Sequence, residues 1–214
     1  SNHVPMTIES LSHMPACLGR TFYERDTAEV ARSLLGKIFV RKLAVPGGIL
    51  KLGGYIIETE AYGYLDDAAS HAFNGLRPRN SVMFGNVGCL YVFFVYGKHF
   101  CANVTARNRD SEAGAVLIRS ILPLAGQVKM TKMRRYSKNL TFGPGRITQA
   151  MSITPAHNGL DVTQEASLIT IHQGQGIVDF VTSKRVGISS AVDRPWRYTA
   201  TKFTSDLKIE SIPR

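Results

Sequence analysis

The sequence predicts an α+β fold, in which an antiparallel β-sheet and a few helices form a single mixed domain. Three features predict it: a Pro46-Gly47-Gly48 turn between two strand-like runs, a second pair of such runs within residues 90–106, and a helix-start signal at Asp26. The chain of 214 residues contains no internal repeat, low-complexity tract or linker. We therefore expect one domain over residues 21–214, preceded by an extended N-terminal arm over residues 1–20, where no periodicity is visible.

The first predicted element is a helix over residues 26–36. Asp26 is a good N-cap, Glu29 follows three positions later as in a capping box, and Gly36 can end the helix. The apolar stripe of this helix consists of Val30, Leu34 and Leu35. A strand over residues 37–43 follows and returns through the proline-glycine turn, so the first two strands are expected to pair antiparallel.

The second strand continues into a stretch, residues 55–71, with an unusual set of side chains. Side chains alternate between the two faces of a strand, so one face carries Ile56, Glu58, Glu60 and Tyr62. An acidic loop then leads to His71. Two carboxylates, an aromatic ring and an imidazole this close together are compatible with an active site. They are equally compatible with an edge strand that has a solvated polar face, followed by a surface loop.

The next segment, residues 72–86, carries Arg77 and Arg79 and lacks an apolar pattern. It is either an ordinary surface loop or a loop that contacts phosphate groups. The net charge of the whole chain, +10, favours the second interpretation.

Residues 90–96 and 100–106 predict a tight β-hairpin, because only three residues separate two strand-like runs. Tyr96 then lies at or near the hairpin tip. There it either folds back on the sheet or acts as a wedge that enters a base stack. Asn103 is a polar residue inside the partner strand, and if it is buried it needs hydrogen-bond partners, which a ligand could supply.

The second half of the chain adds two more candidate residues. Arg119 lies near the end of a strand over residues 115–120, where a half-buried guanidinium needs an anion, either Glu60 or a phosphate. A glycine-rich turn into a helix over residues 141–151 places Arg146 where it can contact phosphate. The other predicted elements are a basic helix over residues 122–136 and short strands over residues 167–172, 177–180 and 186–188.

Composition narrows the class of protein. The charge of +10 and the sequence pI of about 9.7 favour an anionic partner, such as nucleic acid, acidic lipid or a phosphorylated substrate. Three cysteines without a CxxC pair indicate neither a disulfide framework nor a structural zinc site, and they fit a reducing compartment. No membrane-spanning run or signal peptide is visible, so we expect an intracellular protein. Motifs for a P-loop, a dinucleotide fold, a GxSxG nucleophile and an HExxH metal site are missing.

Eight segments occur in an order that resembles the alkyladenine (3-methyladenine) DNA glycosylase family: FYERDTAEVARSLLGK, ETEAY, PRNSVMF, LYVFFVYG, FCANV, AVLIRS, GPGRITQAM and RVGIS. The resemblance extends from about Tyr23 to Tyr198. It implies a curved, mostly antiparallel sheet surrounded by helices, with a protruding β-hairpin. It also implies a monomeric, monofunctional enzyme of base excision repair without cofactor or metal, acting in the cytoplasm and nucleoid, or in a nucleus. Such an enzyme flips 3-methyladenine, 7-methylguanine, hypoxanthine or ethenoadenine out of double-stranded DNA and leaves an abasic site.

The resemblance assigns roles to single residues. Glu60 matches the general base that activates water, and Arg119 matches the arginine that helps to place this water. Tyr96 matches the residue that intercalates into the DNA. In the base pocket, Tyr62 and His71 match residues on one side of the flipped base, and Phe93 matches the residue on the other side. Asn103 matches the residue that excludes the 2-amino group of guanine. Leu117 matches a pocket residue beside it. A member of this family carries tyrosine at the position of Phe93, so any hydrogen bond from that hydroxyl is absent here.

Arg77, Arg79 and Arg146 are the candidates for phosphate contacts on the DNA, and Glu58 is expected to oppose the ionisation of Glu60 unless Arg119 offsets it. Two further hypotheses remain open from the residues alone. The chain could be a DNA-binding module without catalysis, in which Glu60 is an ordinary strand carboxylate. It could also be a metal hydrolase whose ligands are Glu58, Glu60 and His71.

Overall fold

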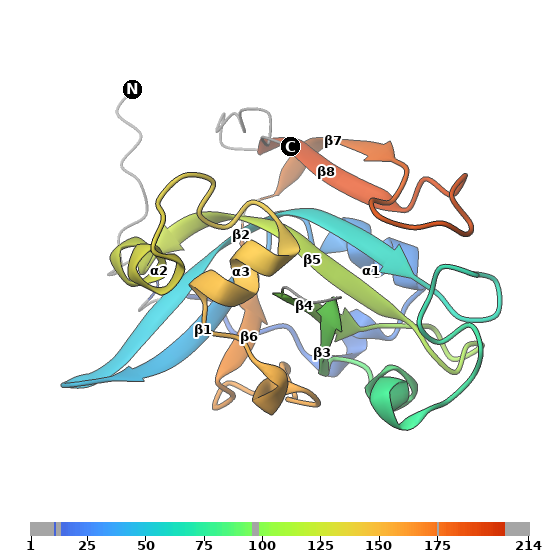
Figure 1. Ribbon diagram of the computed structural model, residues 1–214, viewed down its shortest axis with the longest axis horizontal. Helices are drawn as coiled ribbons and strands as arrows, with labels where there is room; N and C mark the ends of the chain where they lie inside the picture. The colour runs from blue at the N-terminus through green and yellow to red at the C-terminus, as the bar shows by residue number, and fades with distance from the viewer. Residues whose placement is uncertain (1–10, 12–13, 96–98, 175, 204–214) are drawn as a thin grey trace.

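The computed structural model describes residue 11 and residues 14–95, 99–174 and 176–203 (Figure 1). Within these residues the framework is one curved β-sheet, whose main path runs β3-β4-β5-β2-β1-β6, while β8 pairs with β2 and carries β7. Every strand pair is antiparallel, which confirms the predicted α+β fold. The strands are β1 (Ile38–Val45), β2 (Gly48–Tyr62), β3 (Leu90–Val95), β4 (His99–Thr105), β5 (Ala115–Ala125), β6 (Ile169–His172), β7 (Ile177–Ser183) and β8 (Arg197–Phe203).

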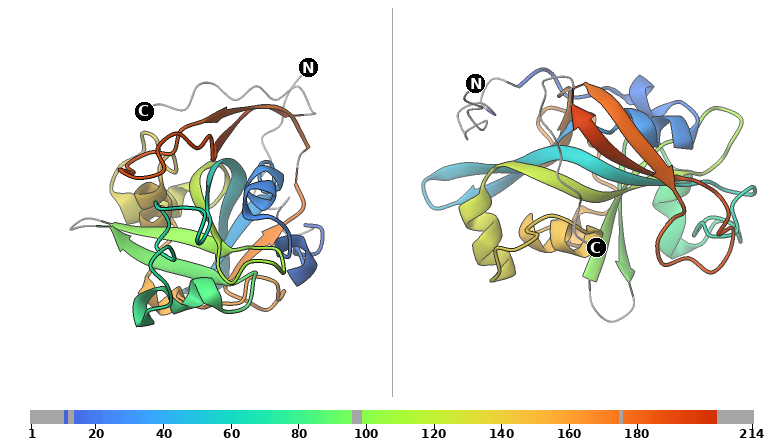
Figure 2. Two further views of the ribbon diagram at one scale, coloured as in Figure 1. Left: turned by 90° about the vertical axis from the view of Figure 1, so that its right-hand side faces the viewer. Right: turned by 90° about the horizontal axis from the view of Figure 1, so that it is seen from above.

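Helices cover both faces of this sheet. On one face, α1 (Thr27–Ser33) packs against β2 and β5. On the other face lie α2 (Gln127–Arg134) and α3 (Pro144–Ala150), and the β3–β4 hairpin projects from the same side (Figures 1 and 2). Helix α3 contacts β4, so the hairpin and α3 stand side by side. Three short 3-10 helices lie entirely within the described residues: η2 (Arg20–Tyr23), η3 (Pro78–Phe84) and η4 (Pro155–His157).

The helix predicted after Asp26 is present, and its N-terminus is capped by one half of the predicted box. The Asp26 carboxylate accepts a hydrogen bond from the backbone N–H of Glu29 at 3.3 Å. The Glu29 side chain does not complete the box, because it pairs with Arg25 at 3.0 Å instead. Gly36 has a φ of +83°, a left-handed conformation that favours glycine, and it turns the chain from α1 into β1.

Strand β2 is the centre of the sheet, not an edge. It pairs with β1 over its first half, with β5 over its second half, and with β8 at residues 58–60. The interpretation of residues 55–62 as a solvated edge strand is therefore wrong: every residue from Leu52 to Ala61 is buried. The strict alternation predicted for this strand is also interrupted. Register shifts on either side of Glu58 make the pairing of β2 with β5 irregular there, and Ile56 belongs to the apolar core.

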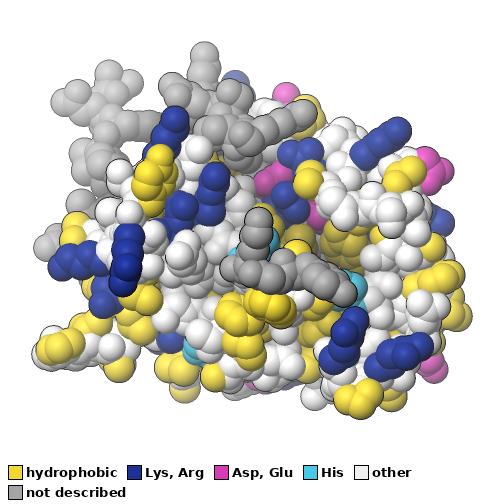
Figure 3. Space-filling model, viewed as in Figure 1, with side chains coloured by type: hydrophobic (Ala, Val, Ile, Leu, Met, Phe, Trp, Pro, Cys, Tyr) yellow, Lys and Arg dark blue, Asp and Glu magenta, His cyan; other side chains and the backbone are white. Residues whose placement is uncertain are grey.

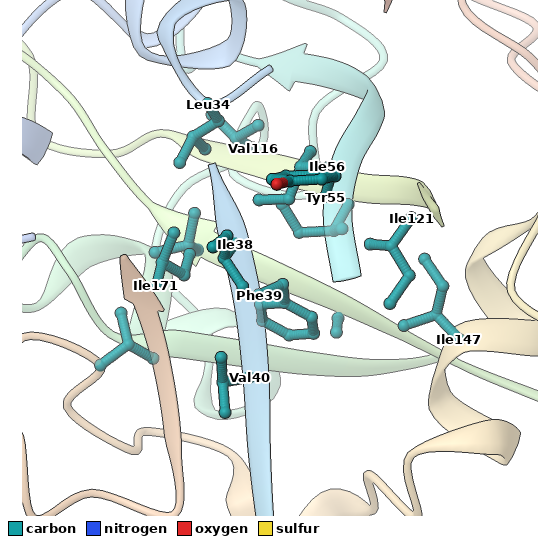
Figure 4. Packing of buried hydrophobic residues seen from close by; sticks show 14 of the residues in the cluster. Leu34, Ile38, Phe39, Val40, Tyr55, Ile56, Val116, Ile121, Ile147 and Ile171 are labelled. Carbon is teal, nitrogen blue, oxygen red and sulfur yellow. The ribbon is translucent and has the colours of Figure 1, made fainter. Parts of the chain in front are cut away.

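The apolar core connects the layers on both faces of the sheet. Side chains from β1, β2, β5 and β6 pack with Leu34 at the end of α1 and Ile147 of α3 (Figure 4). Phe39 and Ile56 are fully buried among them. Burial of each such side chain contributes about 1.5–3 kcal/mol relative to exposure, so this cluster holds the central strand in place.

The second half of the chain departs from the predicted elements at three points. Strand β5 extends to Ala125, where a helix was expected from residue 122, because this apolar run is buried opposite β2. Helix α2 starts only after Gly126, whose φ is +81°. Residues 186–188 are not a strand, and the strand after them, β8, was not predicted.

Two other segments are more ordered than expected. The segment over residues 72–86 contains η3, whose Met83 is buried. In the N-terminal arm, the described residues Leu11 and Leu18 are buried, and the N–H of Leu18 donates to the carbonyl of Ile171 in β6 at 2.7 Å. This part of the arm therefore belongs to the core of the domain.

Candidate active site

A cavity of about 880 Å³ opens on the face that carries α3 and the β3–β4 hairpin. Its wall combines segments that are far apart in the sequence: the end of β2 and the loop after it, β3, β4, β5, the start of α3 and residues 186–190. Eight of the eleven candidate residues named from the sequence line it: Glu60, Tyr62, His71, Phe93, Asn103, Leu117, Arg119 and Arg146. Arg77 and Arg79 do not line the cavity, and Tyr96 lies outside the described residues.

Glu60 lines this cavity and has no solvent-exposed surface. Its Oε1 accepts a hydrogen bond from the Tyr62 hydroxyl at 2.9 Å and lies 3.4 Å from Nη1 of Arg119. Its Oε2 accepts from the backbone N–H of Val186 at 2.7 Å. A buried carboxylate is costly unless donors surround it, and these three donors meet that need from three different segments.

Glu58 is nearly as buried as Glu60 but has its own partners. Its Oε1 accepts from the Ser120 hydroxyl at 2.8 Å, and its Oε2 accepts from Nε of Arg197 at 2.7 Å. Nε of Arg119 lies 3.5 Å from the same Oε2. Arg119 therefore stands between the two carboxylates, as the prediction that it offsets their repulsion requires.

A third buried carboxylate, Asp67, forms a two-pronged ion pair with Arg185 at 2.6 and 2.8 Å, and neither side chain is exposed. Burial alone raises the pKa of Asp67, but the hydrogen bonds from Arg185 and from the N–H of Gly63 outweigh burial and hold this pKa below its usual value. The Arg185 guanidinium also lies between the Tyr62 and Trp196 rings, 4.7 and 5.2 Å from their centroids. Three buried carboxylates in this region thus face three arginines.

These contacts fix the position of Tyr62. Its ring packs against Arg185, and its hydroxyl donates to Glu60. Burial and the neighbouring Glu60 charge both raise the pKa of Tyr62, so the hydroxyl keeps its proton and remains a donor. Arg185 additionally donates to the carbonyl of Ala61 at 3.0 Å, which ties the segment that precedes Val186 to the end of β2.

His71 and Phe93 form the aromatic part of the cavity. Their ring centroids are 3.9 Å apart, and Nδ1 of His71 lies 3.2 Å from the Tyr91 hydroxyl. The His71 ring is partly buried by these neighbours, although the residue as a whole is accessible to solvent. This burial, together with the positive charge of Arg79, lowers the pKa of His71. The imidazole is therefore neutral at neutral pH.

The amide of Asn103 has a defined orientation. Its Nδ2 donates to the backbone carbonyl of Tyr91 at 3.1 Å, directly across the β3–β4 pair, so its Oδ1 and the second hydrogen of Nδ2 remain for a ligand. Leu117 pairs with Asn103 on the next strand. Cys101 lies two positions earlier on the same strand, and burial raises the pKa of its thiol to about 11, so it remains protonated.

The arginines expected to contact phosphate have different surroundings. Arg77 and Arg79 are exposed on η3, whose Asn80 is buried and donates to the carbonyls of His71 and Gly75. Asn80 therefore joins η3 to the segment that carries His71. Arg146 is half-buried and donates from Nη1 to the carbonyl of Phe142 at 2.9 Å, which leaves its other donors available to the cavity.

Lysine and arginine side chains flank the cavity on the outer surface (Figure 3). On one side they gather over α2 and the turn after it, where Lys132, Arg135 and Lys138 are exposed. Arg134 is different, because its guanidinium donates to the carbonyls of residues 138, 139 and 140 and so holds this turn. On the other side, the basic side chains lie near η3 (Figure 3).

Several residues of the site were not found from the sequence. Val186 acts through its backbone N–H, which no side-chain pattern can indicate. Arg185 and Arg197 occur in short polar segments without periodicity, and Tyr91 reads as one more aromatic residue in a buried strand. Asp67 was noted only as part of an acidic loop. Their roles depend on which strands pair, and β8 in particular was missed.

A fully buried carboxylate beside a cavity with aromatic walls is typical of an enzyme site that encloses a planar ligand. Comparison with known proteins makes this specific: the chain belongs to the Methylpurine-DNA glycosylase family, whose sequence profile matches residues 21–203.

Individual relatives agree. A protein of Agrobacterium fabrum named "Putative 3-methyladenine DNA glycosylase" is 43% identical over 182 residues, which cover 84% of this chain and 86% of the relative. Proteins with the same name from Koribacter versatilis and Methanocella arvoryzae are 39% and 42% identical, and the matches cover 86% and 85% of this chain and 89% and 90% of the relatives.

Two other findings concern alternatives raised by the sequence. In the part of the chain that the structure describes, no group of three or more histidine, cysteine, aspartate or glutamate side chains is arranged to hold a metal ion. The proposed ligand set of Glu58, Glu60 and His71 therefore receives no support. No helix among the described residues is long and apolar enough to cross a membrane.

Proposed function

We propose that this protein is a DNA glycosylase that removes alkylated or deaminated purines from double-stranded DNA by hydrolysis of the N-glycosidic bond. The observation that carries the proposal is the position of Glu60: a fully buried carboxylate, held by Tyr62, Arg119 and Val186, that lines a cavity with aromatic walls. Membership of the Methylpurine-DNA glycosylase family supports the same reaction.

In the proposed mechanism, Glu60 is the general base. Cleavage of the glycosidic bond develops positive charge on the sugar and negative charge on the leaving base. An ionised carboxylate takes a proton from the attacking water and stabilises the positive charge. The water adds to the sugar carbon, the base leaves with the bonding electrons, and an abasic site remains. Arg119, which lines the cavity beside Glu60, is positioned to orient this water.

A monofunctional reaction is favoured over strand cleavage. A glycosylase that also cleaves the strand uses an amine nucleophile, which forms a Schiff base with the sugar. Among the described residues that line the cavity, none is a lysine. We therefore assign hydrolysis by water, with no covalent intermediate on the protein.

Recognition of the base relies on stacking. Purines alkylated at N3 or N7 carry a positive charge, and the rings of Tyr62, His71 and Phe93 can hold them by stacking and cation–π attraction. A neutral His71 suits this role because it adds no repulsion. A base inserted between two rings needs about 7 Å, twice the spacing of stacked bases of about 3.4 Å. Since His71 and Phe93 are 3.9 Å apart, one of these rings has to move when a base enters.

In this proposal the protein first binds double-stranded DNA without regard to damage, and base flipping follows. The basic surfaces on both sides of the cavity supply affinity for phosphate without regard to sequence. The β3–β4 hairpin projects beside the cavity. Tyr96 lies outside the described residues, and on the basis of the sequence we assign it as the wedge that fills the space left by the flipped base. Extrusion of a base costs a few kcal/mol, and less for a damaged or mispaired one, which adds selectivity.

The direct test uses duplex oligonucleotides that contain a single hypoxanthine or 3-methyladenine. We expect release of the free base and an intact strand that breaks only after alkaline treatment, as an abasic site does. The competing hypothesis, a DNA-binding module without catalysis, predicts no release and equal affinity for damaged and undamaged duplexes. That pair of results would overturn the proposal.

Replacement of Asn103 by alanine is expected to relax the exclusion of guanine. The Asn103 side chain is held toward the cavity by its bond to Tyr91, and its removal leaves room for the 2-amino group. We expect the release of guanine from undamaged or mismatched sites to rise by about tenfold or more, with a smaller change for hypoxanthine. Base release from guanine-containing and hypoxanthine-containing duplexes measures the ratio; an unchanged ratio contradicts the role of Asn103.

Replacement of Arg77 and Arg79 together by alanine is expected to weaken binding of damaged and undamaged duplexes to the same extent. If both arginines contact phosphate, the plot of the logarithm of the DNA association constant against the logarithm of salt concentration becomes less steep. The magnitude of its slope decreases by about 1.8, which is about 0.9 for each lost contact. Fluorescence anisotropy over a range of salt concentrations measures this slope. A matched double variant on exposed lysines outside this surface, Lys184 and Lys202, serves as control. An unchanged slope would exclude both arginines as phosphate contacts.

A further inference from the structure

We propose that Arg197 is a positioning residue for base excision: by pairing with Glu58, it leaves Arg119 available to Glu60 and to the reacting groups. This inference rests on the proposed function. It concerns a strand that sequence analysis missed and a carboxylate, Glu58, to which the mechanism gives no role.

The geometry of the two carboxylates sets the problem. Glu58 and Glu60 lie two positions apart on β2, with 4% and 0% of their side-chain surfaces exposed. Each needs a cation, because an uncompensated buried carboxylate is strongly disfavoured. Arg119 can reach both: its Nε lies 3.5 Å from Glu58 and its Nη1 lies 3.4 Å from Glu60. With Arg119 as the sole cation, the two carboxylates would compete for one guanidinium.

Arg197 removes this competition. Its Nε donates to Oε2 of Glu58 at 2.7 Å, which is shorter than either contact of Arg119. Nε of Arg119 makes no hydrogen bond with any described residue, although it is buried. The close partner of Glu58 is therefore Arg197, and Arg119 is held by longer contacts that leave its donors free to face the cavity.

The sheet topology delivers Arg197 to this place. In the β2–β8 pair, Arg197 lies opposite Glu60 and Thr199 lies opposite Glu58, so the side chain of Arg197 reaches diagonally to Glu58. Ser120, opposite Glu58 on β5, occupies the other carboxylate oxygen. Arg197 also lies 3.4 Å from the Ser183 hydroxyl of β7, which orients the guanidinium.

No other described arginine can take over. Arg185 is the next cation in this region, and both of its terminal nitrogens are bound to Asp67. Loss of Arg197 would therefore leave Arg119 as the nearest cation for Glu58. Arg119 would shift toward Glu58, away from Glu60 and from the site of the attacking water.

The test measures base release from a hypoxanthine duplex under single-turnover conditions, together with the affinity for the same duplex. The variants are Arg197→Met, Arg197→Lys, Glu58→Gln and the double variant Glu58→Gln/Arg197→Met. Arg194→Met serves as the matched control, because Arg194 packs on Trp196 in the same segment and, among the described residues, makes no hydrogen bond or ion pair with Glu58 or Glu60. Circular dichroism and thermal unfolding establish that each variant is folded.

We expect Arg197→Met to slow base release by about 10- to 100-fold, the range for small displacements of catalytic groups, with little change in affinity for DNA. Arg197→Lys keeps the charge and should lose less. The decisive comparison is the double variant against Glu58→Gln alone. Once Glu58 is neutral it no longer attracts Arg119, so the Arg197→Met change should have almost no further effect in that background.

Three results would overturn the positioning role. The first is an Arg197→Met variant as fast as the wild type. The second is additivity: Arg197→Met slows base release by the same factor in the Glu58→Gln background as in the wild type. Such additivity indicates a merely structural role. The third is an equal loss in Arg194→Met. If Arg197→Met does not fold, the comparison of the double variant with Glu58→Gln still decides. A wild-type protein that releases no base would overturn the proposed function itself, which distinguishes the two failures.

Discussion

Replacement of Glu60 by glutamine is expected to abolish base release while the protein still binds DNA. Glutamine has nearly the same shape but carries no charge, so it can neither take a proton from water nor stabilise the positive charge on the sugar. We expect the single-turnover rate on a hypoxanthine duplex to fall by about a thousandfold or more. Affinity for DNA should remain close to that of the wild type, because Glu60 is fully buried and is not part of the outer surface expected to contact phosphates.

Two controls make this result specific. Glu29→Gln removes a carboxylate that is exposed on α1, where it pairs with Arg25, and base release should not change. Thermal unfolding of Glu60→Gln checks the fold, since the amide has to accept from the N–H of Val186 with its oxygen and place its NH₂ near Tyr62 and Arg119. A folded variant with full activity would show that Glu60 is not the base.

The second large effect concerns stability. Replacement of Asp67 by asparagine is expected to destabilise the protein by about 3–5 kcal/mol, because it leaves the fully buried Arg185 without its counter-ion. Denaturant unfolding at pH 7 measures the loss. Asp110→Asn, an exposed carboxylate, is the control and should change the free energy of unfolding by less than about 0.5 kcal/mol. A loss below about 1 kcal/mol for Asp67→Asn would mean that the pair adds little to stability.

The same pair predicts a dependence on pH. The pKa of Asp67 is lower in the folded protein than in the unfolded chain, where it is about 3.9. The stability that this carboxylate contributes is therefore fully present above that value and is lost as the pH falls through the lowered folded pKa. The difference in stability between wild type and Asp67→Asn should be constant above about pH 5 and should shrink below about pH 4. A difference that grows on acidification contradicts this assignment.

Local structure was largely predictable from the sequence. The capped helix after Asp26, the Pro46-Gly47 turn and the hairpin of β3 and β4 each depend on neighbouring residues, and all three are present. The helix after Gly143 begins with Pro144 as expected. Signals of this kind act within a few residues, so no knowledge of the tertiary structure is needed to find them.

Errors arose where distant contacts decide the outcome. The apolar run at the end of β5 has a composition that suits a buried helix as well as a strand, and pairing with β2 makes it a strand. Residues 186–188 seemed strand-like, yet they form an irregular segment whose backbone reaches Glu60. The irregular register at Glu58 likewise arises from the pairing of β2 with β5, which the local sequence does not reveal.

The stretch over residues 55–71 therefore carries several chemical groups of the site, since its order of amino acids places two carboxylates, Tyr62 and His71 within seventeen residues. The tertiary structure alone decided which partners each carboxylate has. Strand β8 brings Arg197 to Glu58, and the segment after Arg185 brings the N–H of Val186 to Glu60. The physical reason is that a buried charge is defined by its partners, and these partners come from segments more than 120 residues away in the sequence.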